Sequence, residues 1–216
     1  VKDQLKGQVK FIFQPAEEGS PAGEVGGAEV MVKEGVLKNP DVDVIFGLHI
    51  AAGKPMGTIS YKPEGIMAAS DRFIIKIHGK QAHGSTPWLS VDPIVTATQI
   101  ITGLQAIISR ETELTKEAAV ISVGMVQAGI RYNIIPEEAI ITGTIRTLDK
   151  GMQTKIHEQI RLKATKIAES MGATVEVDIK TLAPLTYNDP DLTAMMIPSL
   201  IKAAGDRNVE LIKAIT

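Results

Sequence analysis

The chain has 216 residues, a length that predicts one large domain or two smaller ones. Hydrophobic residues make up 44% and charged residues 22%, shares that are typical of a folded globular protein and disfavour disorder, collagen-like repeats and coiled coil. Lys and Arg number 23 against 25 Asp and Glu, so the net charge is -2, and without a basic block neither nucleic acid nor a membrane surface is an expected partner.

The sequence has no run of about 20 apolar residues that could cross a bilayer, and its first residues are too polar for a signal peptide. We therefore expect a cytoplasmic location. Cysteine is absent, which leaves His and carboxylates as the strong metal ligands. Because the chain begins at Val1 rather than Met, we expect it to be an internal fragment of a longer protein.

Short apolar runs between glycine-rich turns predict an α/β unit at the start of the chain. Val9–Phe13, Val42–Leu48 and Gly57–Tyr61 have the composition of buried strands. Between the first two, residues 27–34 carry apolar side chains at helical spacing and stop at Gly35. A strand, a helix and a strand in this order form the building block of a parallel sheet.

Residues 70–182 alternate strands and amphipathic helices. One helix begins at Asp92-Pro93, an N-cap followed by proline, and a second runs from about Lys150 to Met171 and is closed by Gly172. The predicted strands flank them at residues 71–77, 118–126, 138–146 and 174–180. The order strand, helix, strand, strand, helix, strand is that of a ferredoxin-like α+β domain. A last helix is predicted after Asp189-Pro190.

Acidic residues and a histidine follow two neighbouring predicted strands. Glu17 and Glu18 come directly after the first strand, and His49 ends the second. The carboxyl ends of parallel strands are where α/β proteins bind ligands, and His with Glu at one edge suits a metal ion. Taken separately, a solvated acidic turn and a hydrogen-bonded structural histidine are the commoner interpretations.

Further polar candidates lie between the later elements. His83 is in a turn-rich loop, Gly79–Trp88, where functional residues concentrate, although a plain surface connection fits equally well. Asn133 and Arg146 carry weaker signals. Arginine at a strand end is usually a solvated charge, although its planar group suits a carboxylate.

Several motifs together resemble the M20 family of metallohydrolases, in the amidohydrolase/carboxypeptidase subgroup. The motifs QPAEEG, GGAEVMVKEG, VDVIFGLH, GKQAHGSTPW, RYNIIPEEA and GTIRTLD occur in order over essentially the whole chain. The resemblance implies an α/β catalytic domain, of which residues 1–69 and 183–216 are parts, and an inserted ferredoxin-like lid and dimerisation domain at residues 70–182.

The resemblance also implies a role for each candidate. Glu17 would be the general base, and Glu18 and His49 would be metal ligands in a site for two divalent ions, zinc, manganese or cobalt. His83 would reach the active site of the partner subunit in a homodimer. Asn133 and Arg146 would hold the carboxylate of a small N-acyl amino acid or peptide, whose amide bond a metal-activated water cleaves.

Two of the family's metal-ligand segments have no counterpart in these 216 residues. We therefore expect the chain by itself to have an incomplete site and to be inactive. The alternative is a non-enzymatic ferredoxin-like module that dimerises or binds an amino acid, and the strand order alone supports it equally well. An RNA-recognition module is disfavoured because aromatic residues are only 4% of the chain.

Overall fold

The computed structural model describes residues 5–17, 21, 24 and 26–216. The chain divides into two compact units, residues 1–54 and residues 55–216, which are described separately below. No helix in the described part of the chain combines the length and the apolar character needed to cross a membrane. Both units contain helices, and the second also contains antiparallel sheets and one parallel strand pair, so the chain has a mixed α and β fold.

The first unit is organised around one short helix, α1 (Gly27–Lys33). It lies where the apolar spacing predicts a helix, and the chain turns away from it at Gly35, whose positive φ of 83° suits glycine. The ammonium group of Lys10 donates hydrogen bonds to the carbonyl oxygens of Val36, Lys38 and Pro40, at 2.6–3.1 Å. These bonds tie the segment before the acidic motif to the loop after α1.

The two strands predicted in this unit are wrong for the described structure. Residues 9–13 and 42–48 form no strand, and most of their side chains are exposed, Phe13 by 86% and Leu48 by 88%. A parallel pair needs neighbouring strands and a covering layer on both faces. The described residues of this unit supply neither, so the parallel sheet expected for residues 1–69 does not form there.

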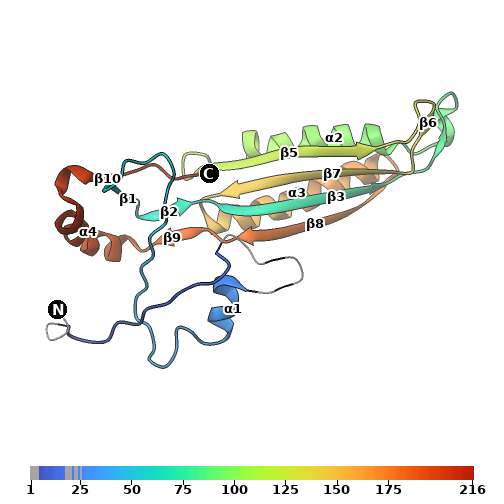
Figure 1. Ribbon diagram of the computed structural model, residues 1–216. Coiled ribbons are helices and arrows are strands. Elements are labelled where there is room, and N and C mark those ends of the chain that lie inside the picture. Colours follow the sequence, from blue (N-terminus) through green and yellow to red (C-terminus); the bar gives the residue numbers. More distant parts are fainter. Residues whose placement is uncertain (1–4, 18–20, 22–23, 25) are drawn as a thin grey trace. The chain divides into compact units, whose positions relative to one another are not determined.

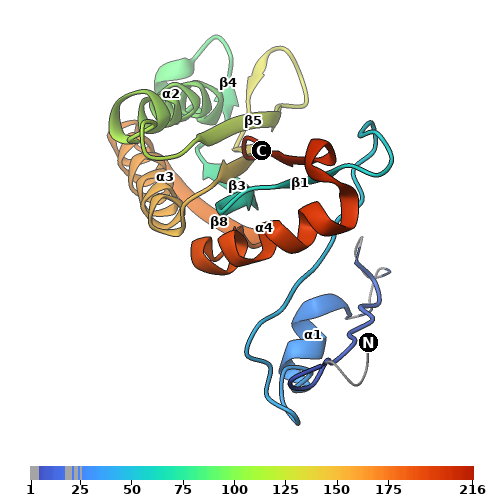
Figure 2. The same cartoon turned by 90° about the vertical axis from the view of Figure 1, so that its left-hand side faces the viewer.

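The second unit is built on a four-stranded antiparallel sheet in the order β5-β7-β3-β8. Its strands are β3 (Ala69–His78), β5 (Ala119–Ala128), β7 (Glu138–Thr147) and β8 (Thr174–Ala183). Helices α2 (Pro93–Ala106) and α3 (Lys150–Ser170) both cover the same face of the sheet, and a π-helical turn, η3 (Ile107–Glu111), extends α2 (Figure 1, Figure 2). The predicted order of strands and helices over residues 70–182 is confirmed.

The hydrophobic core lies between this sheet and its two helices. The strands alternate, so that every second residue of β3 from Phe73 to Ile77 is fully buried. The helices contribute the residues at steps of three and four: Ile100, Leu104, Ile156, Ile160, Ala164 and Ala168. Asp92 and Asp149 cap the two helices, as a side-chain oxygen of each accepts backbone N–H groups of the first turn.

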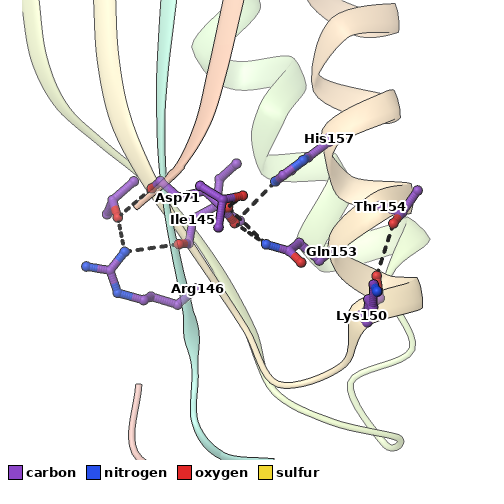
Figure 3. A network of polar contacts seen from close by, with 9 residues as sticks. Asp71, Ile145, Arg146, Lys150, Gln153, Thr154 and His157 are labelled. Atoms are coloured by element: carbon purple, nitrogen blue, oxygen red, sulfur yellow. Dashed lines mark hydrogen bonds and ion pairs between the residues drawn. The ribbon is translucent and has the colours of Figure 1, made fainter. Parts of the chain in front are cut away.

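One carboxylate lies inside this core. Asp71 is fully buried and accepts hydrogen bonds from Gln153 Nε2 at 2.9 and 3.0 Å and from the Thr181 hydroxyl at 2.5 Å. His157 Nε2 lies 3.2 Å from the same carboxylate (Figure 3). A buried charge is tolerated only when it is paired and hydrogen-bonded, so these contacts join β3, β8 and α3 at one point.

Smaller elements extend the sheet at its two ends (Figure 1). At one end β4 (Ala82–His83) pairs antiparallel with β6 (Ile134–Ile135). The single turn η2 (Pro87–Leu89) follows β4 in the chain. At the other end lie two more strand pairs and the last helix: β1 (Ile59–Tyr61) with β10 (Val209–Leu211), β2 (Glu64–Met67) with β9 (Thr186–Asn188), α4 (Pro190–Ala204) and η4 (Asp206–Asn208). We refer to the β4–β6 end as the tip and to the other as the base.

The close approach of Phe73 to the middle of β7 predicts that Gly143 tolerates no side chain. A Cβ atom at Gly143 would overlap the Phe73 ring and the carbonyl oxygen of Ser122, whereas one at Gly124 would meet nothing within 4 Å. Gly143→Ala should therefore lower the free energy of unfolding by about 1–3 kcal/mol. Gly124→Ala, the matched control in the neighbouring strand, should change it by less than about 0.5 kcal/mol in urea unfolding. Equal effects of the two substitutions would contradict this packing.

The N-cap of α3 predicts a dependence of stability on pH. The hydrogen bond from Lys116, 2.8 Å from Asp149 Oδ2, and the bond from the Met152 amide hold the pKa of Asp149 below its ordinary value of 3.8. Because the folded-state pKa is the lower one, this stabilisation is complete above pH 3.8 and is lost as pH falls through the folded-state pKa. The stability difference between the wild type and Asp149→Asn should shrink over that range, and Lys116→Met should weaken the dependence. A difference that is constant with pH would count against the ion pair.

Candidate active site

Glu17 and His49 come together in the first unit. His49 Nδ1 lies 4.0 Å from a Glu17 carboxylate oxygen, although 32 positions separate the two in the sequence, and both side chains are more than half exposed. Nitrogen and oxygen ligands of one tetrahedral metal ion, each about 2.1 Å from it, would be about 3.4 Å apart. The pair is therefore close enough for both side chains to act at one metal centre.

The backbone around Glu17 is unusual. Ala16, the residue before it, has a positive φ of 52°, a conformation that non-glycine residues seldom adopt. The neighbouring carbonyl oxygens of Pro15 and Ala16 lie beside Gly27 at the start of α1, where a Cβ atom would come within 3.9 and 3.4 Å of them. The left-handed turn at Ala16 redirects the chain after the apolar segment, and so sets where the Glu17 side chain begins.

The first unit supplies part of a metal site. Glu18 lies outside the described residues, and no group of three or more His, Cys, Asp or Glu that could hold a metal occurs among the residues that are described. His49 offers an imidazole and the sequence offers a carboxylate at Glu18, and zinc, manganese and cobalt accept ligands of these types. The donor chemistry therefore fits a divalent metal.

His83 and Asn133 lie together at the tip of the second unit. His83 pairs with Ile134 in the β4–β6 ladder, and the Gly84 amide donates a hydrogen bond of 2.8 Å to the carbonyl oxygen of Asn133. Gly84 permits this approach, because a Cβ atom there would be 3.2 Å from that oxygen. The His83 side chain is exposed and Asn133 is half-buried, so both can meet a ligand at the tip.

Arg146 lies at the base, on the face of the sheet opposite to the helices (Figure 3). Its guanidinium donates to the Thr144 hydroxyl and, at 3.0 Å, to the carbonyl oxygen of Ile145. The Thr144 hydroxyl in turn donates to the backbone carbonyl oxygen of Asp71 at 3.1 Å. Arg146 is thus held by its own strand and by β3.

The structure does not bring Asn133 and Arg146 together within one chain. Asn133 precedes Glu138, the first residue of β7, and Arg146 is eight residues further along that strand. At about 3.4 Å per residue these eight steps span about 27 Å. A single small carboxylate therefore cannot contact Asn133 and Arg146 of the same chain at once.

Two polar features inside the second unit carried no clear signal in the sequence. Asp71 is two residues before Phe73 and four before Ile75, so its side chain is on the buried face of the strand. A charged residue at such a position was the one feature of the sequence that could have indicated a buried carboxylate. His78, which ends β3, lies 3.2 Å from Glu138 and 2.9 Å from Glu176 on the two neighbouring strands. These partners lie far from His78 in the sequence, so the sequence does not reveal them. The contacts of His78 join β3 to β7 and β8, and the contact of His157 with Asp71 joins α3 to β3.

Comparison with known proteins gives a family for the whole chain. The model of peptidase family M20/M25/M40 matches residues 1–215. The chain belongs to this family. It is 38% identical over 193 residues to thermostable carboxypeptidase 2 of Saccharolobus solfataricus, with 89% of this chain and 48% of that protein covered. It is 42% identical over 186 residues to the N-acetylcysteine deacetylase of Bacillus subtilis, with 86% and 47% covered.

A solved structure extends the comparison to three dimensions. A dinuclear metal-binding peptidase of family M20 from Bacillus subtilis superimposes with a TM-score of 0.68 at 35% identity, over 94% of this chain and 48% of that one. The chain therefore spans about half the length of the relatives that it matches. The resemblance drawn from the sequence motifs is confirmed at the level of the family.

Proposed function

We propose that the protein containing this chain is a metal-dependent hydrolase that cleaves the amide bond of N-acyl amino acids or the C-terminal peptide bond of peptides. The observation that carries the proposal is the 4.0 Å approach of His49 to Glu17 in a chain of the M20 family. A module that only dimerises or binds an amino acid has no need for these two residues at one place. Relatives named as a carboxypeptidase and a deacetylase support both substrate classes.

Glu18 and His49 are the residues that would hold metal from this chain, and a relative described as a dinuclear metal-binding peptidase supports a site for two ions. Bound divalent metal supplies polarisation of the amide carbonyl and acidification of a water molecule. Glu17 takes a proton from the attacking water and passes it to the leaving amine, a transfer that needs a carboxylate free of metal ligation. Its exposure leaves room for water beside it.

We further propose that residues 70–182 are the ferredoxin-like lid domain of the enzyme. His83 stabilises the negative oxygen that develops on the amide carbonyl, and Asn133 contacts the substrate beside it. Arg146 binds the substrate carboxylate through its planar guanidinium, which explains a preference for substrates with a free carboxylate. Its anchoring to Thr144 and Ile145 leaves this group oriented before substrate arrives.

The separation of tip and base supports a homodimer. His83 and Asn133 lie at the tip, and the part of β7 between Glu138 and Arg146 alone spans about 27 Å, so one substrate can contact both groups only if they come from two chains. Arg146 is at the end where the chain enters and leaves the sheet, which favours its acting in the site of its own subunit. The tip then serves the site of the partner subunit.

Strand β5 is the better candidate for the edge that pairs with a second copy. Its exposed residues Val120, Met125 and Val126 are apolar. On the other edge, β8 exposes Glu176, Asp178 and Lys180, and the Arg161 guanidinium already donates to the Val177 carbonyl oxygen. Charged side chains and a covered carbonyl protect a strand edge from pairing, whereas β5 lacks such charges over its exposed stretch.

Replacement of the proposed base tests the hydrolase directly. Glu17→Gln in the complete enzyme should lower kcat about 10²- to 10⁴-fold on N-acyl amino acids and dipeptides with added zinc or manganese, because the amide cannot accept the proton. Glu29→Gln, on the exposed face of α1 and paired with Lys33, is the matched control and should leave turnover unchanged. Equal activity of Glu17→Gln and the wild type would refute the assignment.

Mixing inactive variants tests the shared site. A mixture of Glu17→Gln and His83→Ala subunits should recover about a quarter of wild-type activity, because half of randomly formed dimers are mixed and each has one intact site. A mixture of Glu17→Gln and Arg146→Ala should recover none, since Arg146 serves its own subunit. Recovery in neither mixture, with dimers present by light scattering, would show that the tip does not cross between subunits.

A further inference from the structure

The turn that carries His83 folds back on the imidazole ring. The Thr86 amide donates to the His83 carbonyl oxygen at 2.9 Å and closes a tight turn over residues 83–86. Within this turn the Ser85 amide donates to His83 Nδ1 at 3.2 Å, and the Ser85 hydroxyl oxygen lies 2.7 Å from the same nitrogen. This arrangement, a side-chain acceptor bound by the amide two residues later, resembles an Asx-turn with imidazole in place of the amide oxygen.

The backbone amide decides which ring nitrogen carries the proton. An amide N–H can only donate, so Nδ1 must accept, and in a neutral imidazole the proton is then on Nε2. The other tautomer would set Nδ1–H against the Ser85 N–H and lose that bond. The Ser85 hydroxyl can donate or accept, and in the favoured form it donates to the single lone pair of Nδ1, which it shares with the amide.

We propose that Ser85 is a positioning residue that holds His83 as the Nε2–H tautomer and points this donor away from the turn. The inference rests on the proposed function for what the donor meets, the developing oxyanion in the partner's site. A neutral Nε2–H can donate to that oxygen without first gaining a proton. The His83 side chain is exposed, so without the two Ser85 contacts its ring would rotate more freely and present this donor less often.

The tautomer can be measured independently of activity. The chain has only 4 histidines, so ¹⁵N-histidine labelling of the 216-residue chain gives few signals, and His83→Gln assigns the one required. Two-bond ¹H–¹⁵N spectra near pH 8.5, where an ordinary imidazole is neutral, should show His83 protonated on Nε2. A His83 signal from the Nδ1–H form would overturn the proposal.

Variants separate the hydroxyl from the rest of the turn. Ser85→Ala removes the Oγ contact, and it should shift the Nδ1 resonance of His83 and lower kcat of the complete enzyme about three- to tenfold with little change in KM, as expected for one hydrogen bond. Ser85→Thr should restore both. Ser90→Ala, which removes a hydroxyl bonded to the Pro87 carbonyl oxygen in the same loop, should alter neither.

The two proposals fail in different ways. An enzyme without hydrolase activity but with His83 in the Nε2–H form would refute the proposed function and leave the Ser85 contact intact. Hydrolysis with an unchanged Nδ1 resonance and unchanged kcat in Ser85→Ala would refute the role of Ser85. A loss confined to KM would also refute it, because a donor to the oxyanion acts in the transition state.

Discussion

The uninterrupted pairing of β3 with β7 determines where the functional groups of the second unit lie. The two strands pair over ten positions, from Ala69 opposite Thr147 at the base to His78 opposite Glu138 at the tip. A ladder of this length is a rigid spacer. It separates His83 and Asn133 from Arg146 by more than any small substrate can bridge, and the case for two cooperating chains follows from that distance.

The same ladder depends on what lies beneath it. Phe73 occupies the space that Gly143 leaves empty, and the buried Asp71 carboxylate binds groups from α3 and β8 on the helix side. On the opposite face the backbone oxygen of Asp71 accepts from Thr144, which also contacts Arg146. The core and Arg146 are therefore both connected to Asp71, the core through its carboxylate and Arg146 through Thr144 and the Asp71 backbone oxygen.

The first unit works by another principle. Its apolar segments are exposed in the described structure, and its order comes from local contacts: the Lys10 ammonium on three carbonyl oxygens, the helix α1 and the left-handed turn at Ala16. In the same unit Glu17 lies 4.0 Å from His49. The two side chains thus come together in a unit whose described residues have no sheet pairing.

The sequence by itself determined the element order over residues 70–182, the caps at Asp92 and Asp189, and the family, because periodicity, capping and motifs are local properties of the chain. It also pointed to Glu17 and His49 as a pair. The strands expected before these two residues did not form, because a strand needs a neighbouring strand to bond with and an apolar composition does not provide one. Only the tertiary structure decided that Asp71 is buried among Gln153, Thr181 and His157, and that Asn133 and Arg146 lie at opposite ends of a sheet. Both depend on the register between strands far apart in sequence, which side-chain patterns alone do not specify.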